Sequence, residues 1–141
     1  MRIIEFEEKY RDDTIFMVLS AKNALGKVPR LNEDLLDIKA NYFDKGQSFW
    51  IALDEFDRVV GCIGTKTDEE NNFFLSHLYI KYDHKRHGIG SKLLEIAENF
   101  AKEKGYNEVH VHLGKDYLES HIFYPKHGYV EYKEFYMKKN I

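Results

Sequence analysis

One stretch of the chain decides the fold. Residues 73–104 read FFLSHLYIKYDHKRHGIGSKLLEIAENFAKEK. Phe73 to Ile80 is rich in aromatic and aliphatic side chains, which predicts a strand. From Ser91 to Lys104 apolar side chains recur at helical spacing on one face and charged ones fill the other, so we expect a helix that ends at Gly105. The apolar face is formed by Leu93, Leu94, Ala97, Phe100 and Ala101.

Upstream of this stretch the pattern predicts two helices and three strands. We expect strands at 2–6, 49–53 and 59–65, each short and rich in aromatic or β-branched residues. A first helix would be capped by Asp12 or Asp13 and end at Gly26, and a second would be capped by Asn32 and end at Gly46.

Downstream, Glu108–Leu113 alternates apolar residues with histidines, which is strand periodicity. Asp116 and Glu119 form a candidate capping pair for a last short helix, which Pro125 would bend. A final strand is expected at Tyr129–Met137. This order of elements predicts an α/β fold, with a mixed sheet that helices cover on both faces.

Composition narrows the class of protein. The chain has 141 residues, of which 43% are hydrophobic, so we expect a single domain spanning 1–141 with a substantial core. A net charge of −3 argues against nucleic-acid and membrane partners. Cys62 is the single cysteine, and three of the first ten residues are acidic where a secretion signal would be apolar, so we expect a cytoplasmic location.

The loop between the predicted strand at 73–80 and the helix at 91–104 is basic and contains two glycines. Between positions 81 and 92 it carries Lys81, Lys85, Arg86 and Lys92 against Asp83, a local charge of +3. Glycines let a ligand approach the backbone closely, and the free amides of a first helical turn favour an anion. The loop therefore predicts a phosphate-bearing ligand.

Two familiar phosphate loops do not fit. A Walker loop needs a glycine five positions before Gly90, and position 85 is lysine. A dinucleotide fingerprint needs a third small residue where this chain has Leu93, and belongs in the first βα unit of a domain. A glycine-rich turn with a solvated basic rim, or another phosphate-ligand protein, stays an alternative.

Two motifs resemble the GNAT superfamily, the N-acetyltransferases related to the general-control histone acetyltransferase. The family loop reads Gln/Arg-x-x-Gly-x-Gly/Ala, and residues 85–90 match it apart from Lys85 in the first position. Residues 123–129, FYPKHGY, resemble the family's Leu-Tyr-x-Lys-x-Gly-Phe segment. The resemblance covers about Phe73 to Tyr136. It implies a mostly antiparallel central sheet of about six or seven strands.

The resemblance also implies acetyl-CoA as co-substrate. Loop amides would hold the pyrophosphate, and the pantetheine arm would lie like an added strand between the strands at 73–80 and 108–113. Tyr117 stands where many members carry an asparagine. The residues implied to bind the cofactor are Leu78, Ile80, Lys85, Arg86, His87, Gly88, Ile89, Gly90, Ser91, Tyr117 and Phe123.

The same resemblance implies that Tyr124 protonates the departing thiolate. The alternative is that Tyr124 is an aromatic residue that only packs. An attacking ammonium must first lose a proton, and His77 on the cofactor strand titrates in a suitable range. We expect His77 to share a strand face with Leu75 and Tyr79. Glu119 or a chain of water molecules are alternative bases, and a histidine that merely packs between strand and helix is another explanation. A strand amide near Leu78 would stabilise the oxyanion.

The expected function is therefore N-acetylation of a primary amine, on a small molecule or a peptide, by direct transfer in a ternary complex. The alternative is a non-catalytic CoA-binding sensor or regulatory module. No metal is expected: His110 and His112 share a strand face, but a third ligand is missing nearby. The acidic residues of the segment Arg30–Asp34 either lie near a cationic acceptor or belong to a capped, solvated helix start. Aromatic residues of the last strand could pair across a homodimer.

Overall fold

The computed structural model describes residues 1–85 and 87–141. Within them seven strands form one sheet in the order β1-β2-β3-β4-β5-β7-β6. Neighbouring strands are antiparallel except β4 and β5, which are parallel. The strands are β1 (Arg2–Glu5), β2 (Phe49–Leu53), β3 (Val59–Thr67), β4 (Phe73–Ile80), β5 (Glu108–His112), β6 (Val130–Lys133) and β7 (Tyr136–Asn140). The mixed, mostly antiparallel α/β fold is confirmed.

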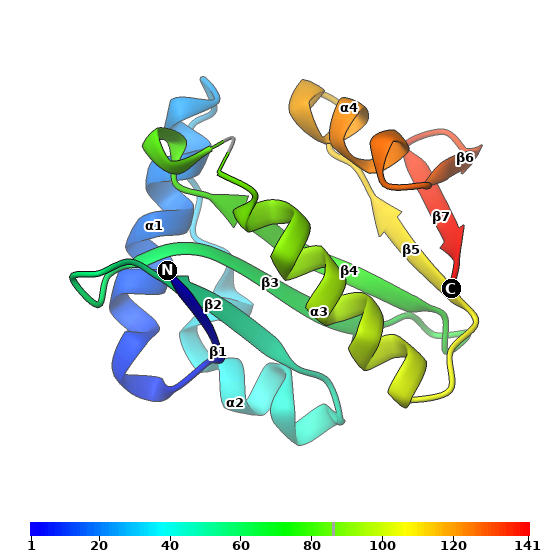
Figure 1. Ribbon diagram of the computed structural model, residues 1–141, viewed down its shortest axis with the longest axis horizontal. Coiled ribbons are helices and arrows are strands. Elements are labelled where there is room, and N and C mark those ends of the chain that lie inside the picture. Colours follow the sequence, from blue (N-terminus) through cyan, green and yellow to red (C-terminus); the bar gives the residue numbers. More distant parts are fainter. Residues whose placement is uncertain (86) are drawn as a thin grey trace.

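Helices cover both faces of the sheet (Figure 1). The helix α3 (Ile89–Glu103) lies across one face with α4 (Leu118–Lys126), while α1 (Arg11–Ala24) and α2 (Ile38–Asn41) pack on the other. Short 3-10 helices are η1 (Glu8–Tyr10), η2 (Glu33–Asp37), η3 (Phe43–Lys45) and η4 (Tyr82–His84).

Two hydrophobic clusters hold the layers together, one on each face. On the α3 face, Leu93, Leu94 and Ala97 are buried against strand side chains such as Val109 and Val111. The predicted apolar face of α3 is thus confirmed, although the helix begins at Ile89 rather than at Ser91. On the α1 face, alternate residues of β2 are fully buried against α1, η2 and α2: Phe49, Ile51 and Leu53.

The predicted second helix is instead a succession of η2, α2 and η3. Asp37 interrupts it, with backbone angles φ −144 and ψ 79, and its carboxylate accepts a hydrogen bond from the Ala40 amide. The Asn41 side chain donates to the carbonyls of Asp34 and Asp37, which an uninterrupted helix would use internally. The stop at Gly46 is confirmed.

Polar side chains that were expected to cap helices make tertiary contacts instead. The helices α1 and α4 begin after Tyr10 and Tyr117, and no side-chain hydrogen bond caps α1, η2 or α4. The expected caps accept hydrogen bonds from distant groups: Asp13 from the Val59 amide, Asn32 from Lys22, and Asp116 from Lys27. A cap is a local contact, and here distant donors compete for the same carboxylates and amide.

The last predicted strand is a hairpin. Strands β6 and β7 pair antiparallel, with Glu134 and Phe135 between them. Phe135 adopts φ +65, a left-handed conformation that reverses the chain. Pro125 is the next-to-last residue of α4, so its missing amide affects only the final turn and not the body of the helix.

Candidate functional site

An opening lies between the two parallel strands of the sheet. Phe74 and His110 form the single registered pair between β4 and β5 among the described residues. Beyond it β4 continues six residues to Ile80, whereas β5 ends at His112. Two cavities of about 120 Å³ each lie between β4 and α4, and Leu78, Tyr79, Tyr117 and Ser120 line both. These cavities therefore form a groove along β4.

A bulge in β4 shapes one wall of this groove. Ser76 pairs with Gly64 and Tyr79 with Cys62, so His77 and Leu78 together oppose the single residue between them in β3. His77 adopts φ +54. The bulge reverses the alternation of side chains: Leu75 belongs to the cluster under α3, whereas Tyr79 packs against the cluster under α1. The expectation that Leu75, His77 and Tyr79 share one face is therefore wrong.

His77 is hydrogen-bonded on the α1 side of the sheet. Its Nε2 lies 2.8 Å from Oδ2 of Asp34, and the hydroxyl of Tyr42 donates to the same carboxylate oxygen. Burial opposes ionisation of Asp34, but these hydrogen bonds outweigh burial and lower the pKa of Asp34 to about 2. An ionised carboxylate thus holds the imidazole at the rim of the groove.

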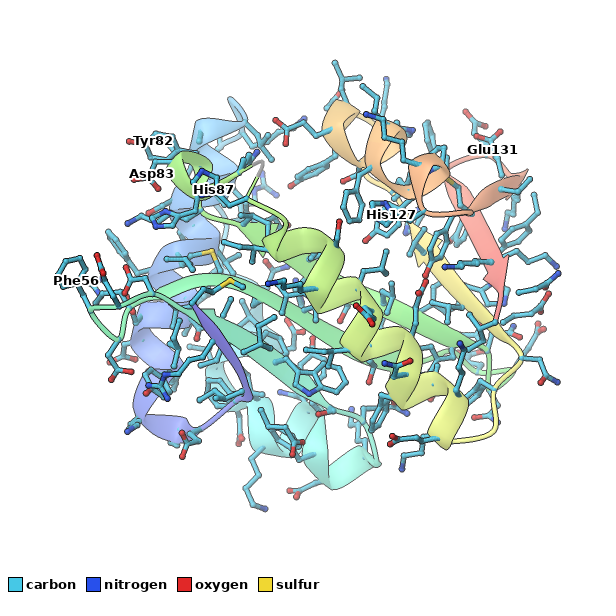
Figure 2. The ribbon with its side chains drawn as sticks, viewed as in Figure 1. Phe56, Tyr82, Asp83, His87, His127 and Glu131 are labelled. Atoms are coloured by element: carbon cyan, nitrogen blue, oxygen red, sulfur yellow. The ribbon has the colours of Figure 1, made fainter. Side chains whose placement is uncertain are left out.

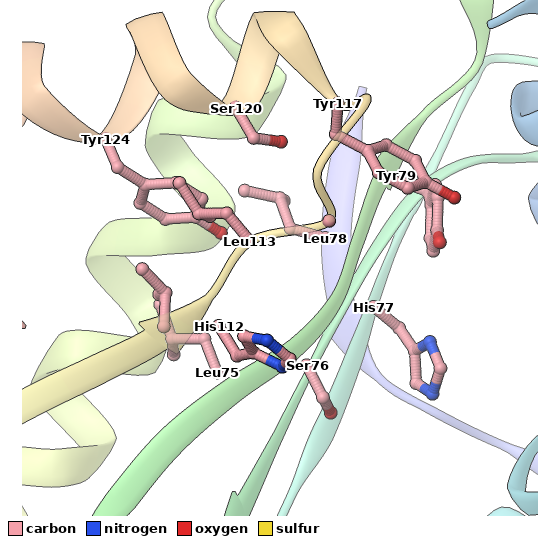
Figure 3. Close-up of a pocket in the computed structure, with 12 residues that line it drawn as sticks. Leu75, Ser76, His77, Leu78, Tyr79, His112, Leu113, Tyr117, Ser120 and Tyr124 are labelled. Atoms are coloured by element: carbon pink, nitrogen blue, oxygen red, sulfur yellow. The ribbon is translucent and has the colours of Figure 1, made fainter. Parts of the chain in front are cut away.

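Tyr124 reaches from α4 into the groove. Figure 3 shows Tyr124 on one side of the cavity, next to Leu113, with His77 on the opposite side. Tyr124 is 5% exposed, and its hydroxyl has no hydrogen-bond partner among the described residues. Burial raises the pKa of Tyr124, with a further contribution from the Glu98 carboxylate, so the phenol stays protonated. The groove therefore contains a phenol hydroxyl that donates to no acceptor among the described residues and that solvent or a ligand can still reach.

The start of α3 forms the far end of the groove. Gly88 precedes the helix with φ +77, a conformation that glycine adopts at low cost. A side chain at Gly90 would lie 3.3 Å from the Phe123 ring, so this glycine allows α3 and α4 to approach each other. The first amides of α3 have no partners within the helix, and with the helix dipole they favour an anion.

Side chains of α4 surround this helix start. The hydroxyl of Ser91 lies 3.0 Å from Nε2 of His127, whose Nδ1 donates to the Phe123 carbonyl at 2.8 Å. Figure 2 shows His127 on the side of α4 that faces α3. Lys85 lines the groove and donates to Glu119 at 2.6 Å. Of the residues expected to bind cofactor, His87 is exposed, and Arg86 lies outside the described residues. The others named above lie along β4, at the start of α3 or on the facing side of α4.

This geometry can hold a ligand that carries a phosphate at one end and an extended arm along β4. The family model described as the acetyltransferase (GNAT) family matches residues 7–129. The chain belongs to this family.

The GNAT fold is equally clear from solved structures. A GNAT acetyltransferase of Staphylococcus aureus superimposes with a TM-score of 0.89 at 24% identity, covering 99% of this chain and 98% of that one. The PaiA N-acetyltransferase of Thermoplasma acidophilum, solved in complex with coenzyme A, gives a TM-score of 0.78 at 22% identity, with coverages of 99% and 98%.

Among curated relatives, human N-acetyltransferase 8 is 32% identical over 102 residues, which is 68% of this chain and 44% of the relative. The camello protein of Xenopus laevis, described as a probable N-acetyltransferase, is 37% identical over 81 residues, 55% of this chain and 36% of the relative. The chain thus spans less than half the length of these relatives.

Other candidate sites in this GNAT chain have structural contacts. His110 Nδ1 lies 2.9 Å from the Tyr132 hydroxyl, and His112 stacks on Tyr136. No three His, Cys, Asp or Glu side chains gather as a metal site in the part of the chain that the structure describes. Cys62 is buried, and burial raises the pKa of its thiol to about 12. No described helix has the length and apolarity to cross a bilayer.

Sequence reasoning missed three features of the site. The first is the contact between Asp34 and His77, which lie 43 positions apart. The sequence placed Asp34 only among acids that face a cationic acceptor or open a helix. The ion pair of Lys27 and Asp116 links the segment after α1 to the loop before α4, 89 positions apart. His127 lies inside the second family motif, but nothing local indicates its contact with Ser91.

Proposed function

We propose that this chain transfers the acetyl group of acetyl-CoA to a primary amine by direct attack in a ternary complex. The observation that carries the proposal is the groove between β4 and β5, with the unpartnered hydroxyl of Tyr124 facing into it. A hydroxyl in this place can donate to a group of a ligand that occupies the groove.

Each part of the groove has a proposed task. The first amides of α3 and the Lys85 ammonium bind the pyrophosphate, and the backbone of β4 near Leu78 and Ile80 aligns the pantetheine arm. Tyr117 and Phe123 line the arm from the side of α4. For Lys85 to reach the phosphates it must loosen its contact with Glu119, which is a largely exposed carboxylate.

The chemistry needs one proton acceptor and one proton donor. His77 takes the proton from the attacking ammonium, and the amine nitrogen then bonds to the thioester carbon. As the carbon–sulfur bond breaks, Tyr124 protonates the leaving thiolate, and the second proton that the nitrogen loses as the amide forms restores the Tyr124 phenol. Desolvation that keeps Tyr124 protonated also destabilises a thiolate at the same place, so the proton transfer does not have to overcome the full difference between the two groups in water.

The opposite positions of the two residues agree with this division of tasks. The acceptor would enter at the His77 end, bounded by the segment 26–46, and the sulfur would leave at the Tyr124 end. The amine itself, a small molecule or a peptide, is part of the proposal. So are a cytoplasmic location, which suits a chain with a single buried thiol, and a homodimer through the aromatic residues of β6 and β7.

Release of free thiol from acetyl-CoA, measured with a broad panel of primary amines, tests the function. We expect turnover above the buffer rate with at least one amine. A chain that is thermally stabilised by CoA but consumes no thioester with any amine would be a binding module, and the proposal of catalysis would be wrong.

A further inference from the structure

Asp34 makes one well-defined contact across the rim of the groove. Its Oδ2 lies 2.8 Å from Nε2 of His77 and also accepts from the Tyr42 hydroxyl. The His77 side chain is 13% exposed and that of Asp34 is 36% exposed. The pair is therefore shielded on the His77 side but open enough at Asp34 for the carboxylate to stay ionised.

The contact fixes which nitrogen of His77 carries the proton. An ionised carboxylate only accepts hydrogen bonds, so the nitrogen facing it must be the donor, which is Nε2–H. In the neutral imidazole Nδ1 is then the basic nitrogen. Among the described residues, the hydrogen bonds of this region leave Nδ1 without a partner. Nδ1 is thus available to a group that enters the cavity lined by His77.

The backbone holds His77 in this position from the other side. The Cys62 thiol donates to the His77 carbonyl at 3.1 Å, and the left-handed conformation of His77 turns its side chain toward η2 instead of α3. The Tyr42 hydroxyl also lies 3.3 Å from Oγ of Ser76, which ties Asp34 to β4 through a second route. The ring contact with Asp34 is therefore supported by contacts of the His77 backbone and of Ser76.

Other titratable groups surround His77, and Asp34 is the carboxylate among them. Lys22 of α1 donates to Asn32 near Asp34, and burial lowers the pKa of Lys22 against the opposing effect of that carboxylate. The remaining groups are Tyr42 after α2, Cys62 of β3, Tyr79 of β4, His112 of β5 and Tyr117 before α4.

We propose that Asp34 is a positioning residue for acyl transfer, which holds Nε2–H of His77 so that Nδ1 points its lone pair at the incoming ammonium. The inference rests on the proposed function. It assigns Asp34 no contact with substrate: the carboxylate orients the imidazole and stabilises the imidazolium that forms when Nδ1 takes the proton. The amine must then be an ordinary basic one, because an acceptor that is already neutral needs no such base.

The experiment compares two acceptors in wild type and Asp34→Asn. One is the primary amine with the highest turnover in the panel, and the other is the alkoxyamine in which oxygen replaces the carbon next to its nitrogen. The alkoxyamine is neutral at the assay pH, so it bypasses the base. We expect Asp34→Asn to lower kcat for the basic amine about 10-fold to 100-fold, which is less than the full contribution of a general base. For the alkoxyamine we expect kcat to change little.

Asp37→Asn is the matched control, because Asp37 lies on the same 3-10 segment and caps α2 without touching His77. We expect it to affect both acceptors equally. The KM for acetyl-CoA should stay unchanged in both variants.

Equal losses for both acceptors in Asp34→Asn, or no loss, would overturn the inference while leaving the proposed function intact. If wild type turns over no amine at all, the proposed function fails, and the inference fails with it. The wild-type reaction therefore separates the two failures.

Discussion

The two faces of the sheet are built in different ways. On one face, α3 is a regular helix that follows a glycine in the left-handed conformation, and its first backbone amides face the groove. On the opposite face, η2 and α2 are short turns, and the site there consists of side chains such as Asp34 and Tyr42. A cofactor shared by a whole family can be bound by backbone, whereas an acceptor specific to one enzyme needs side chains. The difference teaches where substitutions should alter binding, and where chemistry.

The largest effect is expected at Tyr124, on the α3 face of the sheet. Tyr124→Phe removes the proposed donor to the thiolate and should lower kcat about 100-fold or more, within the range of general acid catalysis. The Kd for CoA should change little, since the ring still packs against Phe123 and Tyr129.

Tyr129→Phe is the control for this variant. It removes a hydroxyl that donates to Glu98 at 2.7 Å, away from the groove, and should leave kcat within a few-fold of wild type. If Tyr124→Phe turns over normally, or weakens CoA binding alone, Tyr124 has a packing role and the proposed mechanism is wrong.

A smaller effect is expected at the backbone site. Gly88→Ala forces a side chain into φ +77 and should destabilise the fold by about 1–2 kcal/mol. Gly105→Ala, at the other end of α3 with φ +89 and similarly open space, should cost the same. Titration calorimetry should show that Gly88→Ala alone weakens CoA binding, because it disturbs the amides at the helix start. Equal CoA affinities in the two variants would mean that the phosphates do not bind at this loop.

The smallest effect is expected in the stability that Asp34 contributes on the α1 face of the sheet. The pKa of Asp34 is lowered to about 2, so its hydrogen bonds stabilise the fold above the unfolded-state pKa of about 3.9. This stabilisation should fade as the pH falls from about 5 toward 2. The full shift corresponds to about 2.5 kcal/mol, which solvent screening at this partly exposed carboxylate reduces to about 1 kcal/mol.

Urea unfolding of wild type and Asp34→Asn at a series of pH values measures this contribution. The stability difference between the two proteins should shrink toward zero in acid. A difference that is constant with pH would mean that the charge of Asp34 does not stabilise the fold, and that its contact with His77 is weaker than the geometry indicates.

The same contrast explains what could be predicted from the sequence. Strand β4, helix α3 and the loop between them follow from local periodicity and two glycines, so the phosphate end was expected at these residues. The bulge at His77 was not, because a register shift depends on pairing with β3, which carries no local signal. Asp34 was expected only near a helix start or a cationic acceptor and Asp116 in a capping pair, since their distant hydrogen-bond donors are visible only in three dimensions.

The distance between Oη of Tyr124 and the thiol sulfur, in a crystal structure of the chain with CoA, tests the central claim most directly. The account predicts that the sulfur lies within hydrogen-bond reach of Oη, with the pantetheine arm along β4 and the pyrophosphate on the first amides of α3. A sulfur that lies outside the groove between β4 and β5, or a pyrophosphate bound away from Gly88 and Gly90, would contradict it.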